Sequence, residues 1–460
     1  MNETLSRIKG VPNVTMKKQK TGCTLLLAAS LALTGCASAE SSGPAQESSS
    51  ADTTAAAATT STTTATTTTA VTAADTTAPA ETAAEPEEDY FHGADGYFCL
   101  LDDMPDYART TQKGGTCWLY AGTMSMETCY FKTTGSYISI NPMRLLKIIY
   151  LNDKEEGFMV KKGYNGRWIG GWQWIIAETL SRGFDGLALD SSVILDEKNR
   201  DAIKENVRNR GGVAVGVCTG HSNKEGLHHR FYFTLNDTEH TDFNHDITIV
   251  GYDDHFPKSY FNEPAKEDGA WICCNSAYSP ERLYYVSYCT PLEYAYSHSV
   301  TDKYSAVLSY DAGTEPDCSF RTGDSTRTAN VFHGAGKLAA VGTYNVADVQ
   351  NIRIEIYDSS FTTLLASQDA VLDFRGYHTV ELDTPLDVTD FAVAVTYEKG
   401  APVEGDTRDY NEMEYQTVSE SGQSFVWLDG WKDLTGSGIQ QALHMDFAPN
   451  NCCIKALMTE

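Results

Sequence analysis

A long stretch near the N-terminus is built almost entirely from three small residue types, and it limits how much of the chain can fold. Between residues 37 and 88, Ala, Thr and Ser supply 38 of the 52 positions, and the first aromatic residue beyond it is Tyr90. So little apolar surface cannot offset the chain entropy that is lost on ordering. β-branched runs such as 66–69 also disfavour a continuous helix. The composition predicts a disordered stalk over residues 37–89, open to O-glycosylation.

The segment before this stalk is typical of an export signal. Lysines within residues 17–20 precede an apolar run at 25–33, which is shorter than the about 20 residues of a bilayer-spanning helix. The run ends in Leu-Thr-Gly-Cys36, which resembles the lipobox of bacterial lipoproteins. That resemblance implies that residues 1–36 are a lipoprotein signal and that Cys36 carries the lipid. The alternative is a plain secretory signal cut near residues 37–39, and both interpretations predict an exported protein.

The charge balance excludes two classes of partner. The chain of 460 residues has 35 Lys and Arg against 62 Asp and Glu, a formal net charge of -27. Nucleic acids and anionic membrane surfaces both attract positive protein surface, so we expect neither nucleic acid nor direct electrostatic membrane binding. The expected contact with a membrane is the lipid anchor alone. A chain of this length suggests two or three domains.

The cysteines do not form a regular framework. Twelve are present, and two of them, Cys23 and Cys36, fall in the export signal. The other ten are irregularly spaced and contain no Cys-x-x-Cys pair, so a zinc ribbon is not predicted. If one is a nucleophile, nine remain and cannot all pair, so we interpret most of them as small buried side chains. The pair His228–His229 is interpreted as a surface pair, and no metal or other cofactor is expected.

One cysteine stands directly after a glycine-rich loop. Gly114 and Gly115 precede Thr116, Cys117 and Trp118, and the residues through about position 130 read as a helix of small and apolar side chains. A thiol at a helix N-terminus lies at the positive end of the macrodipole, which favours the thiolate. The two glycines allow the backbone to approach a substrate carbonyl closely. Cys117 is therefore a candidate nucleophile, provided that a base lies nearby.

Candidate partners occur more than a hundred residues downstream. His245 opens an apolar stretch that reads as a strand, a second strand over 269–274 leads into Asn275, and residues 282–288 alternate like a third. Two neighbouring antiparallel strands can present His245 and Asn275 side by side. A nucleophilic thiolate needs a histidine to exchange its proton, and the histidine needs an acceptor to orient it.

These motifs resemble papain-family cysteine peptidases, in the bacterial branch that carries a lectin-like domain after the peptidase. His245 and Asn275 follow Cys117 by 128 and 158 residues, close to the roughly 130–150 residues seen in papain-like enzymes. The resemblance covers about residues 95–300 and implies a papain-like α+β fold, half helical and half antiparallel sheet, over 90–310. The matching segments are Cys117-Trp118, Glu127, Asn244-His245, Val250-Gly251-Tyr252-Asp253 and Trp271 through Asn275-Ser276.

The resemblance implies a role for each matching residue. Cys117 would be the nucleophile, His245 the general base and then acid, Asn275 the residue that orients the imidazole, and Gln112 an oxyanion donor beside the Cys117 N–H. The implied activity is that of a cell-surface endopeptidase acting on proteins or peptides. Departures from the family pattern include the spacing of Gln112, which precedes Cys117 by five positions where the family has six. The family's extra Cys before the nucleophile is also missing, and its Asn-Ser-Trp-Gly reads Asn-Ser-Ala-Tyr278. A non-catalytic adhesin on the same scaffold and an acyltransferase using the same triad remain alternatives.

The C-terminal third changes to short alternating strands. Residues 349–357, 377–382 and 391–397 alternate apolar and polar side chains, with turn residues between them. This pattern predicts an all-β sandwich over 311–460. Segments at 329–332, 340–344, 376–382, 421–425 and 453–456 resemble the lectin-like domain of the same bacterial branch. Trp427 and Trp431 either stack on a glycan or pack a turn, and the sequence leaves that choice open.

Overall fold

The structure is a computed structural model that describes residues 95–150, 156–221, 223–228, 232–278, 283–313, 318–405, 408–409 and 412–460. Residues 94–460 belong to one compact unit. The predicted export signal, the lipidation site Cys36 and the stalk lie outside the described residues and stay predictions. Within the described ranges, no helix has both the length and the apolar character needed to cross a bilayer.

The helices gather in the first half of the described chain, and the longest begins at the candidate nucleophile. They are α1 (Cys117–Thr134), α2 (Pro142–Ile149), α3 (Gln173–Leu180), α4 (Arg200–Asn209) and the short α5 (Ile439–Ala442), with 3-10 turns η1 (Leu100–Asp103) and η2 (Lys258–Tyr260). The start of α1 confirms the predicted helix. It ends where Gly135 takes a left-handed conformation, with φ 72°, which suits glycine because a Cβ is disfavoured there.

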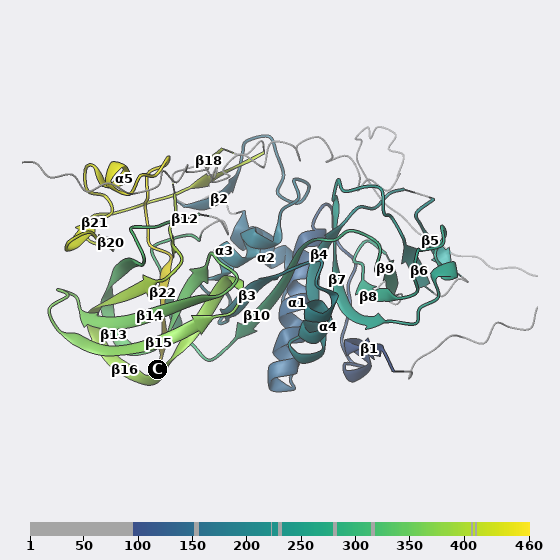
Figure 1. The fold of residues 1–460 in the computed structure, drawn as a ribbon, viewed down its shortest axis with the longest axis horizontal. Helices are drawn as coiled ribbons and strands as arrows, with labels where there is room; N and C mark the ends of the chain where they lie inside the picture. Colours follow the sequence, from purple (N-terminus) through teal and green to yellow (C-terminus); the bar gives the residue numbers. More distant parts are fainter. Residues whose placement is uncertain are drawn as a thin grey trace, which may run out of the picture. The chain divides into compact units, whose positions relative to one another are not determined.

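A mostly antiparallel sheet packs against α1, which lies beside β4 and β7 (Figure 1). β4 lies between β10 and β7, β7 pairs with β8 and β1, and β8 pairs with β9. The predicted strands that flank His245 and Asn275 are confirmed as β7, β8 and β9. The strands of this part are β1 (Tyr97–Cys99), β2 (Gly157–Val160), β3 (Ala188–Leu195), β4 (Val213–Val217), β5 (Glu225–His228), β6 (Tyr232–Leu235), β7 (His245–Asp253), β8 (Ala270–Cys274), β9 (Tyr284–Ser287) and β10 (Glu293–Thr301).

The C-terminal part is almost entirely antiparallel strand. β13 pairs with β16 along most of its length, with two register shifts, and the two predicted strands at 377–382 and 391–397 prove to be parts of β16 alone. The predicted strand at 349–357 is confirmed as β14. The strands are β11 (Ala306–Leu308), β12 (Ser319–Phe320), β13 (Thr326–Asn345), β14 (Gln350–Asp358), β15 (Leu364–Leu372), β16 (Arg375–Tyr397), β17 (Ala401–Pro402), β18 (Arg408–Asp409), β19 (Met413–Gln416), β20 (Ser424–Trp427), β21 (Trp431–Asp433) and β22 (Ile454–Thr459).

Strand pairing joins the two parts. β16 pairs with β3, with Arg375 opposite Ile194, and β19 pairs with β2, with Met413 opposite Val160. The Tyr344 hydroxyl donates to the Ser181 hydroxyl at 3.0 Å. Strands from both sides of the predicted domain boundary at residues 310–311 are thus hydrogen-bonded to one another. The boundary itself stays a prediction.

Charged side chains are buried in the C-terminal part. Lys455 forms an ion pair with Asp311, and both side chains are fully buried; the Lys455 ammonium also lies 4.9 Å from the centre of the Tyr344 ring. Glu404 accepts hydrogen bonds from the Tyr415 hydroxyl and the Asn451 amide, both at 2.6 Å. Burial raises the pKa of Glu404 to about 8, because a carboxylate loses its hydration in such a place.

Candidate active site

Backbone contacts fix the loop before Cys117. Gly114 has φ +85°, and a Cβ there would lie 2.7 Å from the Arg167 carbonyl oxygen, so only glycine fits without strain. The Gly115 N–H donates to that same carbonyl at 2.9 Å. The glycine pair therefore sets the entry of the chain into α1 against residues 167–168.

The first turn of α1 is anchored on both sides. The Trp118 side chain is buried, and a Cβ on Gly171 would lie 2.3 Å from its ring. On the sheet side, the Thr248 hydroxyl of β7 donates to the Ala121 carbonyl at 3.2 Å. These contacts hold the N-terminus of the helix, and with it Cys117, against the start of β7.

His245 and Asn275 lie side by side, as the strand pattern predicts. His245 Nε2 is 2.8 Å from Asn275 Oδ1, and because an amide oxygen only accepts, Nε2 carries the proton in this bond. Both side chains are buried. Asn275 Oδ1 also accepts the Ala277 N–H at 2.9 Å, so the turn after β8 holds the amide in place.

The Cys117 thiol accepts a hydrogen bond from the backbone N–H of Asp246, the residue after His245. Burial raises its pKa to about 12, and the Asp246 carboxylate adds to that effect, while the backbone N–H groups of Asp246, Trp118 and Cys117 favour the thiolate. The sequence predicts a lowered pKa from the helix N-terminus; burial outweighs that contribution. A thiol whose pKa is raised needs a nearby base to become a nucleophile.

Gln112 lies beside the turn that carries Asn275. Its N–H donates to the Ser276 carbonyl at 2.8 Å, and its side-chain oxygen accepts from the Ser276 hydroxyl, also at 2.8 Å. Its side-chain NH2 donates to the Gly114 carbonyl at 2.8 Å. Contacts through Ser276, Gly114 and Asp246 thus bring all four sequence-predicted residues to one place.

Sequence reasoning missed a polar chain that leads away from the site. Asp246 Oδ2 accepts from Gln173 Nε2 at 2.6 Å, Gln173 Oε1 accepts from His298 Nε2 at 3.0 Å, and His298 Nδ1 lies 2.8 Å from the Ser192 hydroxyl. Burial raises the pKa of Asp246 to about 6 and lowers that of His298 to about 3. The sequence does contain a sign of this polar chain, because an acid directly after His245 interrupts an otherwise apolar strand.

A second acid lies across the sheet from Asp246. Gly216 of β4 pairs with Asp246 on one side and with Glu293 of β10 on the other, so all three face the same side of the sheet. A Cβ on Gly216 would lie 3.2 Å from Glu293 Oε2. Burial, and after it the charge of Asp246, raises the pKa of Glu293 to about 7. Acidic charge near Cys117 is therefore neutralised in part below neutral pH.

The sequence pattern also singles out other cysteines, two tryptophans and a histidine pair, whose surroundings in the structure are as follows. The ten cysteines of the described ranges are free thiols, and Cys273 and Cys274 are buried in separate clusters, as expected for opposite faces of a strand. Trp427, 43% exposed, packs edge-on against Trp431 with ring centres 5.4 Å apart. Of the histidine pair, His228 ends β5 and His229 lies outside the described residues.

Comparisons with known proteins concern both parts of the chain. The family model "Lectin like domain" matches residues 309–458. No curated protein matches the chain. A structure of the clostridial cysteine protease Cwp84, a cysteine-to-alanine variant after propeptide cleavage, matches with TM-score 0.63 and 16% identity over 78% of this chain and 98% of that one. The cysteine protease and lectin-like domains of Cwp84, described as a surface layer associated protein of Clostridium difficile, match with TM-score 0.61 and 16% identity over 80% and 90%.

This likeness establishes the fold. The C-terminal third matches the lectin-like family model over residues 309–458. Over 78–80% of its length, the chain shares the fold of the Cwp84 structures, which contain protease and lectin-like domains.

Proposed function

We propose that this protein is a cysteine endopeptidase of the bacterial cell surface, with Cys117, His245 and Asn275 as its catalytic triad. The observation that carries the proposal is the 2.8 Å contact between His245 Nε2 and Asn275 Oδ1. With Nε2 committed to the amide, Nδ1 is the ring nitrogen that exchanges a proton with the thiol. The hydrogen bond from the Asp246 N–H to Cys117 supports the required closeness, because Asp246 is the next residue after His245.

The reaction follows from these roles. His245 takes the thiol proton as Cys117 Sγ attacks the peptide carbonyl, which forms a C–S bond and a tetrahedral oxyanion. The carbon–nitrogen bond then breaks, His245 returns the proton to the leaving amine, and a thioester remains. Water, deprotonated by His245, attacks the thioester and releases the acid and the thiol. Burial raises the pKa of the thiol, so transfer of its proton to His245, which gives a thiolate–imidazolium pair, is required for attack.

The oxyanion would lie at the start of α1. The Cys117 N–H has no partner within its own helix turn, as for all first-turn N–H groups, and the second donor would be the Gln112 amide. One N–H of that amide is bound to the Gly114 carbonyl, so the other N–H would serve the oxyanion. Loss of one such donor costs about 100- to 1,000-fold in kcat.

We also propose a substrate class, a location and a glycan-binding surface for this enzyme. The substrates would be proteins or peptides outside the cell, with the domain held on the lipid at Cys36 by the stalk. The described similarity to a surface-associated protease supports this location. Glycan binding by the lectin-like domain would use the exposed face of Trp427.

Active-site labelling tests the proposal. The folded wild-type chain should react with an epoxysuccinyl thiol-protease inhibitor and cleave a protein substrate, and Cys117→Ala should do neither. Cys289→Ala is the matched control, since Cys289 is another partly exposed free cysteine and should keep both properties. A folded wild type that is not labelled would favour the adhesin, and joined rather than cleaved peptides in mass spectra would favour the acyltransferase.

A further inference from the structure

A second group of chemically active side chains lies where β4 and β6 end. Cys218 directly follows β4, and His221 is three residues further on; Asp237 follows β6 closely, and His240 is three residues beyond it. The two segments thus supply a Cys-x-x-His pair and an Asp-x-x-His pair. Two ligands with two intervening residues can point at one centre from a single turn, which is the spacing of many zinc sites. The proposed peptidase mechanism uses none of these four residues.

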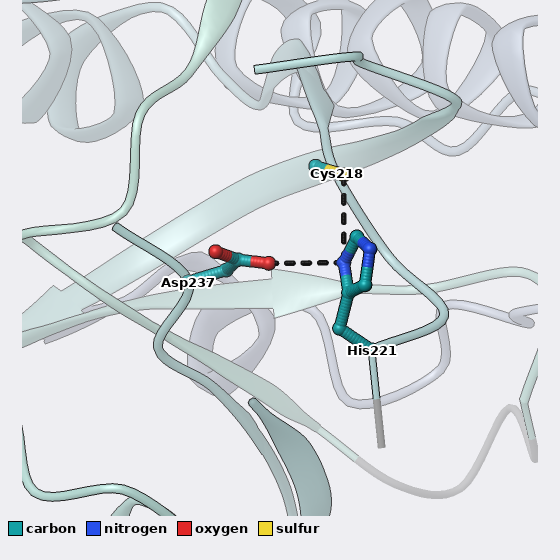
Figure 2. Close-up of side chains that lie close together, drawn as sticks. All are labelled: Cys218, His221 and Asp237. Atoms are coloured by element: carbon teal, nitrogen blue, oxygen red, sulfur yellow. Dashed lines mark hydrogen bonds and ion pairs between the residues drawn. The ribbon is translucent and has the colours of Figure 1, made fainter. Parts of the chain in front are cut away.

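Three of these side chains converge on one point. Figure 2 shows the Cys218 thiol and the Asp237 carboxylate both directed at Nδ1 of His221. Cys218 Sγ is 3.8 Å and Asp237 Oδ2 is 3.1 Å from that nitrogen, and all three atoms lie within 4.8 Å of one another. Tetrahedral Zn²⁺ with bonds of about 2.0–2.3 Å separates its ligand atoms by roughly 3.3–3.7 Å. The observed spacing is therefore close to that of a zinc site.

A fourth side chain, His240, supports this group from the outer shell. His240 Nδ1 lies 2.8 Å from Asp237 Oδ2, and its ring stacks on that of His221 with centres 3.6 Å apart. The other carboxylate oxygen, Oδ1, accepts the N–H groups of Glu239 and His240 at 3.0 and 3.2 Å. These bonds fix the carboxylate so that Oδ2 faces both imidazoles, an outer-shell arrangement that orients metal ligands.

Burial and charge favour a cation at this point. The side chain of Asp237 has no exposed surface and Cys218 is 1% exposed. A buried carboxylate needs compensating charge, and a thiolate and a carboxylate together balance a dication, with the neutral imidazole of His221 as the third ligand. Thiolate and imidazole are ligands of Zn²⁺, whereas Ca²⁺ and Mg²⁺ take oxygen ligands.

Hydrogen bonding alone accounts for the contacts one at a time. The Cys218 thiol donates to Asp242 Oδ1 at 3.4 Å, and each imidazole can donate to Asp237. A metal ion explains why three types of ligand atom meet there.

We propose that Cys218, His221 and Asp237 bind one Zn²⁺ ion that has a structural role, with His240 orienting the Asp237 carboxylate from the outer shell. Val217 pairs in register with His245, so the site joins the end of β4 to the segment that leads into β7. The Asn244 side chain already connects these segments, accepting the Thr219 N–H at 3.0 Å. The ion thus holds the backbone from which His245 projects.

Metal analysis of the full chain tests the site. Protein produced with added zinc and dialysed against metal-free buffer should retain about one zinc per chain. Cys218→Ser and Asp237→Asn should retain none, whereas Cys289→Ser, which removes a free thiol elsewhere, should retain the wild-type amount. Cobalt in place of zinc should give a thiolate-to-metal charge-transfer band that is lost in Cys218→Ser.

Two results would overturn the proposal. One is a folded wild-type chain that takes up no zinc when titrated against a chromophoric chelator of micromolar affinity. The other is a folded Cys218→Ser or Asp237→Asn chain that binds zinc as the wild type does. The first measurement needs no variant to fold. Repeating it on Cys117→Ala separates this site from the peptidase proposal, because metal content does not depend on the nucleophile.

Discussion

Replacement of Asn275 by alanine tests the geometry of the triad most directly. The change removes the acceptor that lies 2.8 Å from His245 Nε2 and leaves the imidazole N–H in a buried place without that partner. During catalysis the ring becomes an imidazolium, and hydrogen bonds to charged groups contribute about 1.5–3 kcal/mol. At 1.36 kcal/mol for each factor of ten, kcat should fall about 10- to 150-fold, with little change in KM.

The assay is single-turnover cleavage of a fluorogenic peptide, with a matched control for the turn that Asn275 also stabilises. Asn345 makes the same kind of turn, because its Oδ1 accepts the N–H of Ala347 at 3.0 Å, as Asn275 Oδ1 accepts that of Ala277 at 2.9 Å. Asn345→Ala should lower stability but leave kcat unchanged. An Asn275→Ala chain with wild-type kcat, or an equal loss in Asn345→Ala, would refute the orienting role.

Three further perturbations have defined directions. Lys455→Met leaves Asp311 buried without its partner, so urea unfolding should show a loss of about 3–5 kcal/mol, and less when Asp311→Asn is added. Glu404 has a pKa raised to about 8, so the native state binds its proton more tightly than the unfolded state does. The stabilisation of the native state by this proton is full below about pH 4.5 and is lost as pH rises toward 8. Unfolding midpoints at several pH values should show this slope, and Glu404→Gln should reduce it. Asp246→Asn removes a charge that raises the pKa of Cys117, so alkylation of that thiol should become faster, chiefly above pH 6, where Asp246 is ionised; an unchanged rate at pH 8 would contradict this effect.

Local sequence patterns predicted the parts of the site that depend on local structure. The glycine loop marked the start of α1 at Cys117, and the change from polar to apolar residues marked the start of β7 at His245. The apolar stretch that leads into Asn275 predicted β8. Each of these features follows from periodicity and turn residues within about ten positions.

Features that join distant segments could not be predicted in this way. Nothing near Val160 indicates that β19 would pair with it, and nothing near Lys455 indicates a buried ion pair with Asp311. Sequence reasoning treated the cysteines one by one, so it did not connect Cys218 with His221 and Asp237, which the fold brings together. The burial that raises the pKa of Cys117 likewise depends on the packing of whole elements.

The pairing of β19 with β2 has a consequence for the timing of maturation. At roughly 5–20 residues per second, on the order of ten seconds or more separate the synthesis of Val160 from that of its partner Met413. Until then, β2 has an open edge, and β3 lacks the stretch of β16 that pairs with it. A chain secreted as it is made would thus leave the cell before its sheets are complete, and its fold would be completed outside.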